Sequence, residues 1–520
     1  MSRRRIVVVG AGVAGLGAAL FLADTGHDVT VVEQDSMPEI GDGDEAFQAW
    51  ERRSVPQWRF AHSFSARSRN LLETRAPQVM TRLRADGIEL FNALSSFLPE
   101  TAQRPEDAEL TAILSRRPAF ELALRRSVEA DDRIRLITPA RVDGLLLTGD
   151  GLPPARDGLP PVDGGRPLAE GGTPPVSTSR PRVGGVTLTD GATLAADLVL
   201  DCGGRRSPVT GWLARAGVTV PVDQQACEFT YYSRYLRAVG DGPVTRGFPR
   251  ADLGYLICWT FPGDHGTYGV AIGGPPWDKE FKVLRHNRAW ERLAGSVPAI
   301  AGWVDPVTGG VPLHDVQVMA GLTNQRRHFV VDGEVLVAGL LVLGDALCTT
   351  NPFFGWGASL ALTHAAAAAD ALAEHGSGSG SDGDGDGVAA LTAAYYDGVN
   401  AEASSLFRSA STMDRLRSYR WRGVPVPDAD TEAAEEEDLI TRGLLPAATK
   451  DPDLLRALMR RMALLDSVDT LFDDPLVRAK AEAERARGIE GAAGAGPSRE
   501  EALALLASVG RPPAPPASAG

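Results

Sequence analysis

The sequence predicts an α/β fold built around a mixed, largely parallel sheet, with a separate antiparallel sheet and a set of C-terminal helices. The parallel sheet is predicted by Arg5–Asp35, where an apolar run rich in Val and Ile leads into closely spaced glycines and an Ala-rich segment. The antiparallel sheet is predicted by aromatic-rich runs between residues 227 and 272 that are separated by short turns. The helices are predicted by apolar residues at helical spacing beyond residue 388.

At the start of the chain, a strand, a glycine turn and a helix follow one another in the order of a dinucleotide-binding unit. Ile6–Val9 is predicted to be a buried strand, and Gly10, Gly12 and Gly15 follow at the G-x-G-x-x-G spacing. The first glycine permits a tight turn, the second lets a pyrophosphate approach the backbone, and the third lets the helix Leu16–Thr25 pack closely. Free N–H groups at the start of that helix favour a phosphate. This stretch predicts a Rossmann-like domain.

A second strand, Asp28–Val32, ends in Glu33, about 20 residues after the glycines, where a carboxylate can accept hydrogen bonds from both ribose hydroxyls. A strand, glycines, a helix, a strand and a terminal acid in this order are far more specific than a glycine motif alone. The expected cofactor contacts in this part of the chain are Gly10, Ala11, Gly12, Val13, Ala14, Gly15, Glu33 and Gln34.

The composition is that of a globular protein with an acidic surface. The 520 residues are 43% hydrophobic and 23% charged, and the formal net charge is −14. Such a chain offers no broad electrostatic attraction to nucleic acid or to anionic lipid, so neither is an expected partner. The length is sufficient for two or three domains, each with its own core.

The four cysteines, Cys202, Cys227, Cys258 and Cys348, stand far apart, which argues against a zinc site or a disulfide framework and indicates a reducing compartment. Three arginines precede the apolar run Ile6–Ala23, as in an export signal, but its glycines suit an export helix poorly and no small-residue cleavage site follows. No later apolar run approaches the length of a membrane span. We therefore expect a cytoplasmic protein without an integral membrane segment.

Shifts in composition divide the chain. Residues 1–215 are expected to form the first part of the nucleotide-binding domain, with a disordered Gly/Pro-rich insertion at 149–185. The further expected segments are a substrate domain with the antiparallel sheet at 216–330, the closing part of the first domain at 331–375, a flexible linker at 376–387, a helical region at 388–509 and a disordered tail at 510–520. Asp382, Asp384 and Asp386 imitate a calcium loop, but Ala393 stands where the required glutamate belongs, so no metal site is expected.

A second motif lies near residue 345. An apolar strand ends in Gly344-Asp345, and the following turn and helix contain Pro352, Gly355, Gly357 and Ala358. With the N-terminal glycines and Arg117, this motif resembles the FAD-dependent monooxygenases of the para-hydroxybenzoate hydroxylase type, within the glutathione-reductase-like flavoproteins. The resemblance extends from Arg5 to about Leu372.

The resemblance implies a Rossmann-like FAD-binding domain in which Asp345 holds a ribityl hydroxyl of FAD. It further implies that the turn and helix after Asp345 place backbone N–H groups against the flavin and its pyrophosphate, and that Arg117 pairs with the cofactor. The implied activity is hydroxylation or epoxidation of a small organic substrate through a flavin hydroperoxide. No nucleophilic triad is then needed, because the flavin carries the chemistry. The residues expected to form the substrate wall are Tyr231, Tyr232, Arg234, Trp259 and Phe353.

The chain departs from the family in the middle motif, which reads roughly Ala-Asp-Gly in the family and helps FAD and the nicotinamide cofactor to dock. Here the corresponding residues are Cys202-Gly203-Gly204, with Asp201 close by. The sequence therefore leaves two electron donors open: NAD(P)H bound directly, or a separate flavin reductase.

Three other functions are compatible with the same motifs. A flavin-dependent halogenase is suggested by Trp259 and Pro262, but Ile257 replaces the first tryptophan of that family's W-x-W-x-I-P motif. The lysine that such enzymes need in the N-terminal portion is also missing, since the first lysine is Lys279. A reductase or dehydrogenase of the geranylgeranyl-reductase type is the main alternative. A non-catalytic FAD protein that binds a partner through residues 451–520 is the last.

Overall fold

The structure is a computed structural model that describes residues 3–62, 64–98, 102–148, 181–240, 242, 249–375, 385–488 and 496–508. The predicted disordered insertion up to residue 180, the predicted linker up to residue 384 and the predicted tail from residue 510 lie outside the described residues.

The parallel sheet predicted from the sequence is present, and it has five strands. Their order is β20-β9-β1-β2-β5, and all neighbours run parallel. The carboxyl ends of the strands therefore meet at one edge, where ligands bind in open α/β sheets. The strands are β1 (Arg5–Val9), β2 (Asp28–Val32), β5 (Ile134–Ile137), β9 (Leu198–Asp201) and β20 (Leu340–Val342).

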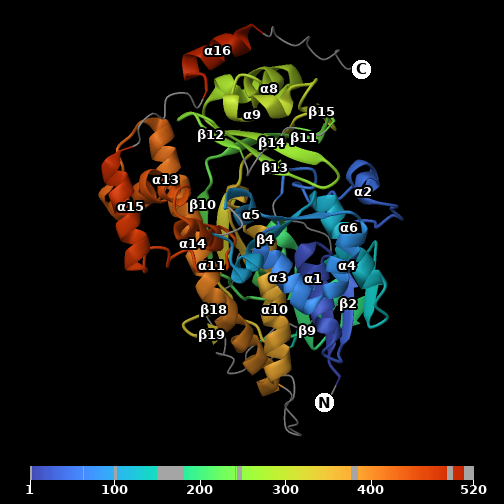
Figure 1. Cartoon of the computed structure of the whole chain (residues 1–520). Coiled ribbons are helices and arrows are strands. Elements are labelled where there is room, and N and C mark those ends of the chain that lie inside the picture. Colours follow the sequence, from blue (N-terminus) through green and yellow to red (C-terminus); the bar gives the residue numbers. More distant parts are fainter. Residues whose placement is uncertain are drawn as a thin grey trace, which may run out of the picture.

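Helices bury this sheet. The helix α1 (Val13–Ala23) packs between α10 (Gly357–His375) and α6 (Arg117–Glu129), and ten of its residues are buried (Figure 1). Because α1 has neighbours on every side, it is apolar all round rather than amphipathic. The outer helix α11 (Gly385–Arg422) then packs on α10.

Short elements surround this core. Residues 186–200, an apolar run that predicts one strand, are divided instead: Gly191 adopts a positive φ of 85°, and the chain forms β7, β8 and β9. The strand β7 also begins inside the segment predicted to be a disordered insertion. These elements are α2 (Gly43–Ala49), α3 (Ala66–Arg75), α4 (Pro77–Ala85), β3 (Glu89–Asn92), α5 (Ala93–Phe97), β4 (Thr111–Leu114), β6 (Val142–Thr148), β7 (Arg182–Leu188), β8 (Thr193–Ala195) and α7 (Val209–Arg215).

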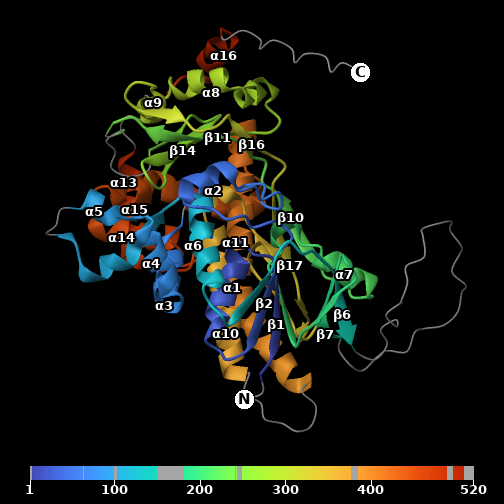
Figure 2. The same cartoon turned by 90° about the vertical axis from the view of Figure 1, so that its right-hand side faces the viewer.

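The second sheet is antiparallel, as predicted, and lies above the carboxyl edge of the first (Figure 2). Its order is β12-β13-β14-β11-β15, with β16 also pairing with β11. The strands are β11 (Thr230–Ala238), β12 (Arg250–Asp252), β13 (Ile257–Pro262), β14 (Thr267–Gly274), β15 (Gly310–Pro312) and β16 (Gln317–Met319).

The outer face of the second sheet is covered by helices. Residues 277–304, whose apolar spacing predicts a helix, form a 3₁₀ turn (Lys279–Arg285), α8 (Asn287–Ala294) and α9 (Pro298–Val304). Pro298 begins the last of these. Four small sheets complete the β-structure of the described residues, and two of them are β3-β4 and β6-β7-β8. Their remaining strands are β10 (Val222–Ala226), β17 (Thr323–Arg327), β21 (Cys348–Thr349), β18 (Val330–Val331) and β19 (Glu334–Val335).

A buried arginine joins the second sheet to the parallel-sheet part. The Arg116 guanidinium donates to both carboxylate oxygens of Asp264, in the turn between β13 and β14, and to Asp44 of α2. Arg116 N also donates to Asp264 Oδ1 over 2.6 Å. Since the Arg116 and Asp264 side chains are at most 1% exposed, removing Arg116 would leave the buried Asp264 carboxylate without its arginine partner.

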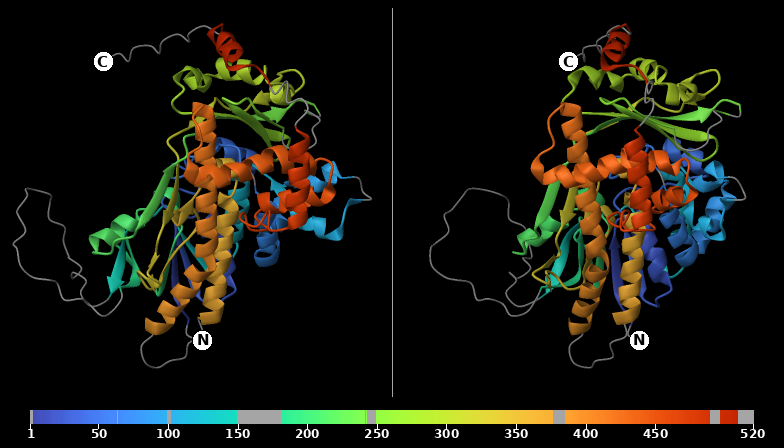
Figure 3. Two further views of the ribbon diagram at one scale, coloured as in Figure 1. Left: turned by 90° about the vertical axis from the view of Figure 1, so that its left-hand side faces the viewer. Right: turned by 60° about the vertical axis from the view of Figure 1, so that its left-hand side comes forward.

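The C-terminal helix α11 contacts both the parallel sheet and the region of the second sheet. The helix α11 starts beside the parallel sheet and reaches the second sheet (Figure 3). In its first turns, Val388, Leu391, Tyr395 and Tyr396 belong to the same apolar core as the parallel strands. The helices that follow are α12 (Thr431–Asp438), a π-helical segment (Leu439–Leu444), α13 (Leu445–Ala448), α14 (Pro452–Met462), α15 (Pro475–Arg487) and α16 (Arg499–Ala507).

Within the described part of the chain, no helix combines the length and the apolar character that crossing a membrane requires.

Leu391→Ala is expected to lower the free energy of unfolding by about 2–5 kcal/mol, because Leu391 is fully buried in the core of the parallel sheet. Urea denaturation followed by circular dichroism measures the change. Leu476→Ala is the matched control, since that leucine is 60% exposed on α15 and its loss should cost less than about 0.5 kcal/mol. Equal, small effects in both variants would show that α11 is not part of the core.

Candidate active site

A cavity of about 520 Å³ begins at the carboxyl edge of the parallel sheet and continues beneath the second sheet. It brings together sequence motifs that lie more than 300 residues apart, since Gly10 and Gly357 both line it. The predicted cofactor residues along it are Gly10, Gly12, Val13, Ala14, Glu33, Gln34, Arg117, Asp345, Pro352, Gly355, Gly357 and Ala358. The remaining two, Ala11 and Gly15, are buried directly behind this lining.

The glycine turn is fixed by close backbone contacts. A Cβ at Gly15 would lie 1.8 Å from Gly10 O, and a Cβ at Gly10 would lie 2.8 Å from Cys202 O. A Cβ at Gly12 would meet nothing within 4 Å and Gly12 lines the cavity. Gly10 and Gly15 therefore let β1, α1 and β9 meet. Gly12 leaves room for a group that approaches the start of α1, where helical N–H groups have no partner within the helix.

Glu33 closes the turn from the end of β2. Its carboxylate accepts from Ala11 N over 2.7 Å, from Asp35 N over 2.8 Å and from Arg52 Nη2 over 3.0 Å, and it lines the cavity. Carboxylates accept up to about four hydrogen bonds, so an acceptor site is left for a ribose hydroxyl. The side chain predicted to bind ribose thus also holds the glycine turn.

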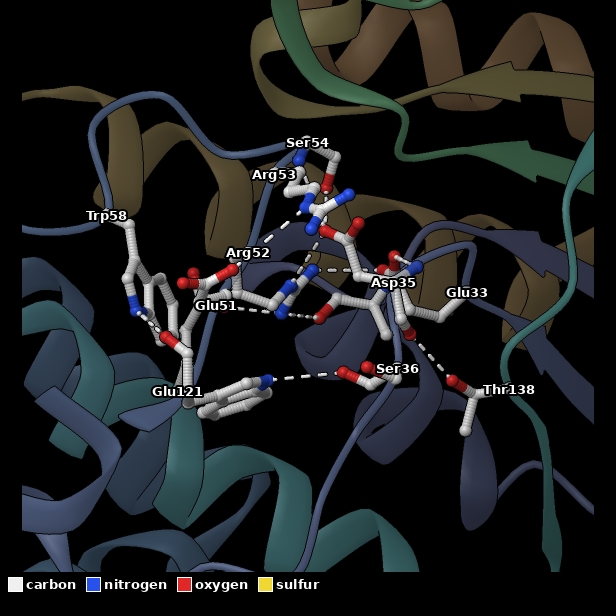
Figure 4. A network of polar contacts seen from close by, with 12 residues as sticks. Glu33, Asp35, Ser36, Glu51, Arg52, Arg53, Ser54, Trp58, Glu121 and Thr138 are labelled. Atoms are coloured by element: carbon white, nitrogen blue, oxygen red, sulfur yellow. Dashed lines mark hydrogen bonds and ion pairs between the residues drawn. The ribbon is translucent and has the colours of Figure 1, made fainter. Parts of the chain in front are cut away.

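Arg52 lies among three carboxylates and connects the glycine turn to α6 (Figure 4). Besides Glu33, it donates to Glu121 Oε2 over 3.0 Å, to Asp35 Oδ2 over 3.3 Å and to Ala11 O over 3.2 Å. Burial disfavours its charge, yet the carboxylates of Glu121, Glu33 and Asp35 outweigh that cost and raise the pKa of Arg52. The guanidinium is therefore a fixed positive charge in the cavity wall.

Arg117 begins α6 and lines the cavity, as predicted. Its Nε donates to Glu121 Oε1 over 2.6 Å, so Glu121 bridges Arg117 and Arg52. Its Nη1 lies 3.4 Å from Nε2 of His62, whose Nδ1 contacts Phe60 O over 2.7 Å. Burial, together with the Arg117 charge, lowers the pKa of His62 to about 3, so this imidazole is neutral near pH 7.

Asp345 is the residue that tests whether FAD fits. The carboxylate lines the cavity, and no hydrogen bond to it occurs among the described residues. Burial raises its pKa, although the charges of Arg117, Arg205 and Arg327 oppose the shift. A buried acceptor without a partner is costly unless a ligand supplies a donor. The ribityl hydroxyls of FAD are such donors, so the residues present fit the cofactor.

His364 of α10 forms a hydrogen bond with the backbone of Gly344 in the Gly-Asp motif. Gly344, with a φ of 57°, donates its N–H to His364 Nδ1 over 2.9 Å. Burial and the charge of Arg67 lower the pKa of His364 to about 3. The ring must be neutral to accept this bond, so protonation would break it.

A polar network from α11 supports the turn that precedes α10. Asn351 accepts from the Tyr231 hydroxyl and donates through Nδ2 to Asp414 Oδ1 over 2.8 Å. Asn324 donates to the other oxygen of Asp414 over 2.8 Å and accepts from Asn351 N over 2.6 Å. Arg417 pairs with Asp414, which is 1% exposed. The helical region beyond the sequence motifs therefore reaches the candidate site.

The structure places two of the predicted wall residues on the cavity. Tyr231 of β11 and Trp259 of β13 both line it, with ring centroids 5.8 Å apart. Phe353 lies behind them: its ring packs 5.6 Å from Trp259 and beneath the Arg417 guanidinium, outside the cavity lining.

The placement of Tyr232 and Arg234 in that wall is wrong. Successive residues of a strand point to opposite faces, so both side chains lie on the outer face of the second sheet when Tyr231 lies on the inner face. Tyr232 belongs to the core beneath α8, and Arg234 pairs with Glu291 over 2.5 Å and stacks on Trp290. The aromatic composition of β11 concealed which residues faced the cavity.

The departure in the middle motif has a structural counterpart. Asp201, at the end of β9, accepts from Gly203 N over 3.0 Å and from Ser207 Oγ over 2.5 Å, and it lines the cavity. A Cβ at Gly203 would lie 3.0 Å from Asp201 Oδ1. An acid at position 203 would therefore crowd the acid already present at 201.

The family comparison agrees with this geometry. Residues 5–152 match the model for the family described as FAD dependent oxidoreductase. This part of the chain is similar to that family. It is also 24% identical over 503 residues to Protein Rv3254 of Mycobacterium tuberculosis, covering 91% of this chain and 92% of that protein.

Solved structures share the fold over most of the chain. PqsL of Pseudomonas aeruginosa, described as a probable FAD-dependent monooxygenase, is 15% identical with a TM-score of 0.55, covering 81% of this chain and 99% of its own. The flavin-dependent brominase Bmp2 is 15% identical with a TM-score of 0.53, and the match covers 94% of this chain and 100% of the brominase chain. The solved structures share the predicted fold, and the match over residues 5–152 agrees with the predicted resemblance to FAD-dependent flavoproteins and supports an enzyme.

Asp345→Ala is expected to weaken FAD binding about 10-fold to 100-fold, because hydrogen bonds to a charged group contribute about 1.5–3 kcal/mol. Fluorescence titration of the flavin-free protein with FAD measures the affinity. The unfolding midpoint of the flavin-free variant should not fall, since the carboxylate makes no contact that stabilises the flavin-free fold. Unchanged FAD affinity would refute the assigned contact.

The free energy of unfolding is expected to fall by about 2 kcal/mol for each buried neutral histidine, such as His364, when the pH drops from about 7 to 5. The folded pKa of His364, about 3, is below the unfolded value of 6.5, so only the unfolded chain gains the proton in this range. His364→Asn keeps an acceptor for Gly344 and should remove its share of this slope. His375→Asn, an exposed histidine of the same helix, controls for the loss of a histidine, and an unchanged slope in His364→Asn would contradict the assignment.

Proposed function

We propose that this enzyme is an FAD-dependent monooxygenase that hydroxylates or epoxidises a small, largely apolar organic substrate. The observation that carries the proposal is a single cavity that joins the cofactor motifs to the aromatic inner face of the second sheet. When bound, FAD in its reduced form supplies two electrons to dioxygen, so that one oxygen atom enters the substrate and the other leaves as water.

The chain's own residues then bind, orient and exclude water. The glycine turn and Glu33 would hold the adenosine end of FAD, and Asp345 with the start of α10 would hold the ribityl and ring end. Tyr231 and Trp259 form an apolar wall across the far end of the cavity. Such a wall favours oxygen transfer to substrate over loss of the oxidising equivalent to water.

A reductase or dehydrogenase would use the same cofactor site without oxygen, and it is the second candidate. Halogenation is favoured only by the fold shared with the brominase and by the partial motif of Trp259 and Pro262. The missing N-terminal lysine argues against it. The electron donor is proposed to be NAD(P)H or a reduced flavin delivered by a separate reductase.

The function is tested with FAD-loaded protein that is reduced photochemically in the absence of oxygen. The test then does not depend on which electron donor the enzyme uses. The reduced protein is then mixed with air-saturated, ¹⁸O₂-enriched buffer and a panel of small aromatic and alkene compounds. A monooxygenase is expected to place one ¹⁸O atom in a product, detected by mass spectrometry. Addition of NADH or NADPH to a parallel sample, with and without a flavin reductase, identifies the donor.

Other outcomes would overturn the proposal in distinct ways. Reoxidation of the flavin by an alkene without oxygen would establish a reductase. Product formation that requires bromide or chloride would establish a halogenase. Hydrogen peroxide as the only product with every compound, or a protein that never takes up FAD, would exclude a monooxygenase.

A further inference from the structure

The inner face of the second sheet consists of three rows of side chains. Directly paired residues share a face, and residues two apart on a strand share it as well. The middle row is Ser233, Ala271 and Trp259, from β11, β14 and β13. One outer row contains Tyr231 and Gly273, and the other contains Tyr235, Gly269 and Phe261.

Neighbouring segments cover the glycine positions of both outer rows. A Cβ at Gly273 would lie 2.1 Å from the ring of Phe229, and a Cβ at Gly269 would lie 2.6 Å from Cβ of Ala61. The space above these two glycines is therefore filled by protein atoms. By contrast, all three residues of the middle row line the cavity. The middle row is the part of the sheet on which a ligand can rest.

The middle row contains one unsatisfied polar group. Ser233 lines the cavity and is 1% exposed, and its buried hydroxyl has no hydrogen-bond partner among the described residues. A buried hydroxyl without a partner costs about 1–3 kcal/mol. The aromatic rings of Tyr231, Trp259, Phe261 and Phe60 also line the cavity.

Two titratable groups of the cavity lining, Arg117 and His62, offer no unpaired charge to this end of the cavity. Arg117 is paired with Glu121 over 2.6 Å, and His62 is a neutral acceptor whose backbone N–H lies 3.4 Å from the Tyr235 hydroxyl. None of the middle-row residues or the aromatic rings around them carries a charge. A carboxylate or ammonium group resting there would lose its hydration without gaining an opposite charge.

We propose that the row Ser233–Ala271–Trp259 is the substrate seat, and that it takes an uncharged ring compound bearing one hydrogen-bonding group that pairs with Ser233 Oγ. The inference rests on the proposed function and names its substrate class. Ser233 is then a specificity-determining residue, Ala271 leaves the space for the ring, and Trp259 provides the face against which the ring packs.

Binding to oxidised, FAD-loaded protein tests this without turnover, through the change of the flavin absorption band and by calorimetry. Three probes are used. The first is 2-naphthol; the second, 2-methylnaphthalene, lacks a hydrogen-bonding group; and the third, 2-naphthoate, carries a negative charge. We expect 2-naphthol to bind more tightly than 2-naphthoate by at least about tenfold. Ser233→Ala should weaken 2-naphthol about tenfold and leave 2-methylnaphthalene unchanged.

Two further variants complete the test. Thr260→Val is the matched control, because Thr260 is fully buried with an equally unpartnered hydroxyl but is not a cavity-lining residue. It should leave all three affinities unchanged. Ala271→Phe should abolish binding of both uncharged probes while the FAD content stays that of the wild type, since Ala271 lies on the second sheet rather than in the cofactor motifs.

Three results would overturn the inference. These are tighter binding of 2-naphthoate than of 2-naphthol, equal effects of Ser233→Ala and Thr260→Val, or retained binding in Ala271→Phe with a normal unfolding midpoint. Failure of the wild type to bind any probe up to its solubility limit would also overturn it. Failure of the proposed function is separate, because it shows as missing FAD or missing oxygen transfer rather than as altered probe selectivity.

Discussion

The close approach of Gly15 to the carbonyl of Gly10 is the constraint on which the rest of the structure depends. With 1.8 Å between that oxygen and a hypothetical Cβ, no other residue can follow the same path. The contact brings the start of α1 to the carboxyl edge of the sheet, beside the ends of β9 and β20. Every other part of the candidate site is placed relative to that edge.

Charge is distributed along the cavity in a way that separates its two ends. At the cofactor end, the buried ions form a connected chain in which Glu33, Arg52, Glu121 and Arg117 alternate in sign. Such groups are stable only while each is paired, so the chain fixes geometry rather than adding net stability. At the other end, hydrophobic rings surround one hydroxyl. A nucleotide and an apolar ring would thus each find a matching environment in one continuous space.

The sequence was sufficient to predict the parallel sheet, the antiparallel sheet and most cofactor residues, because glycine spacing and strand-end acids leave direct traces in a chain. Arg52, His364 and Asp414 were missed, since each is a single polar residue in an irregular segment or a helix and has no local motif. Their roles arise from contacts between segments far apart in the chain, such as Asp414 with Asn351. Tyr232 and Arg234 were misplaced because β11 is aromatic on both faces, so its composition carries no information about orientation.

The position of α11 has a consequence for how the protein is made. The parallel sheet receives its outer strand from residues 340–342, and its core is completed by the first turns of α11, which the ribosome produces after the whole second sheet. A nascent chain that ends before residue 399 therefore exposes an apolar surface that the finished protein buries. The N-terminal nucleotide-binding segment therefore cannot complete its core until α11 has been synthesised.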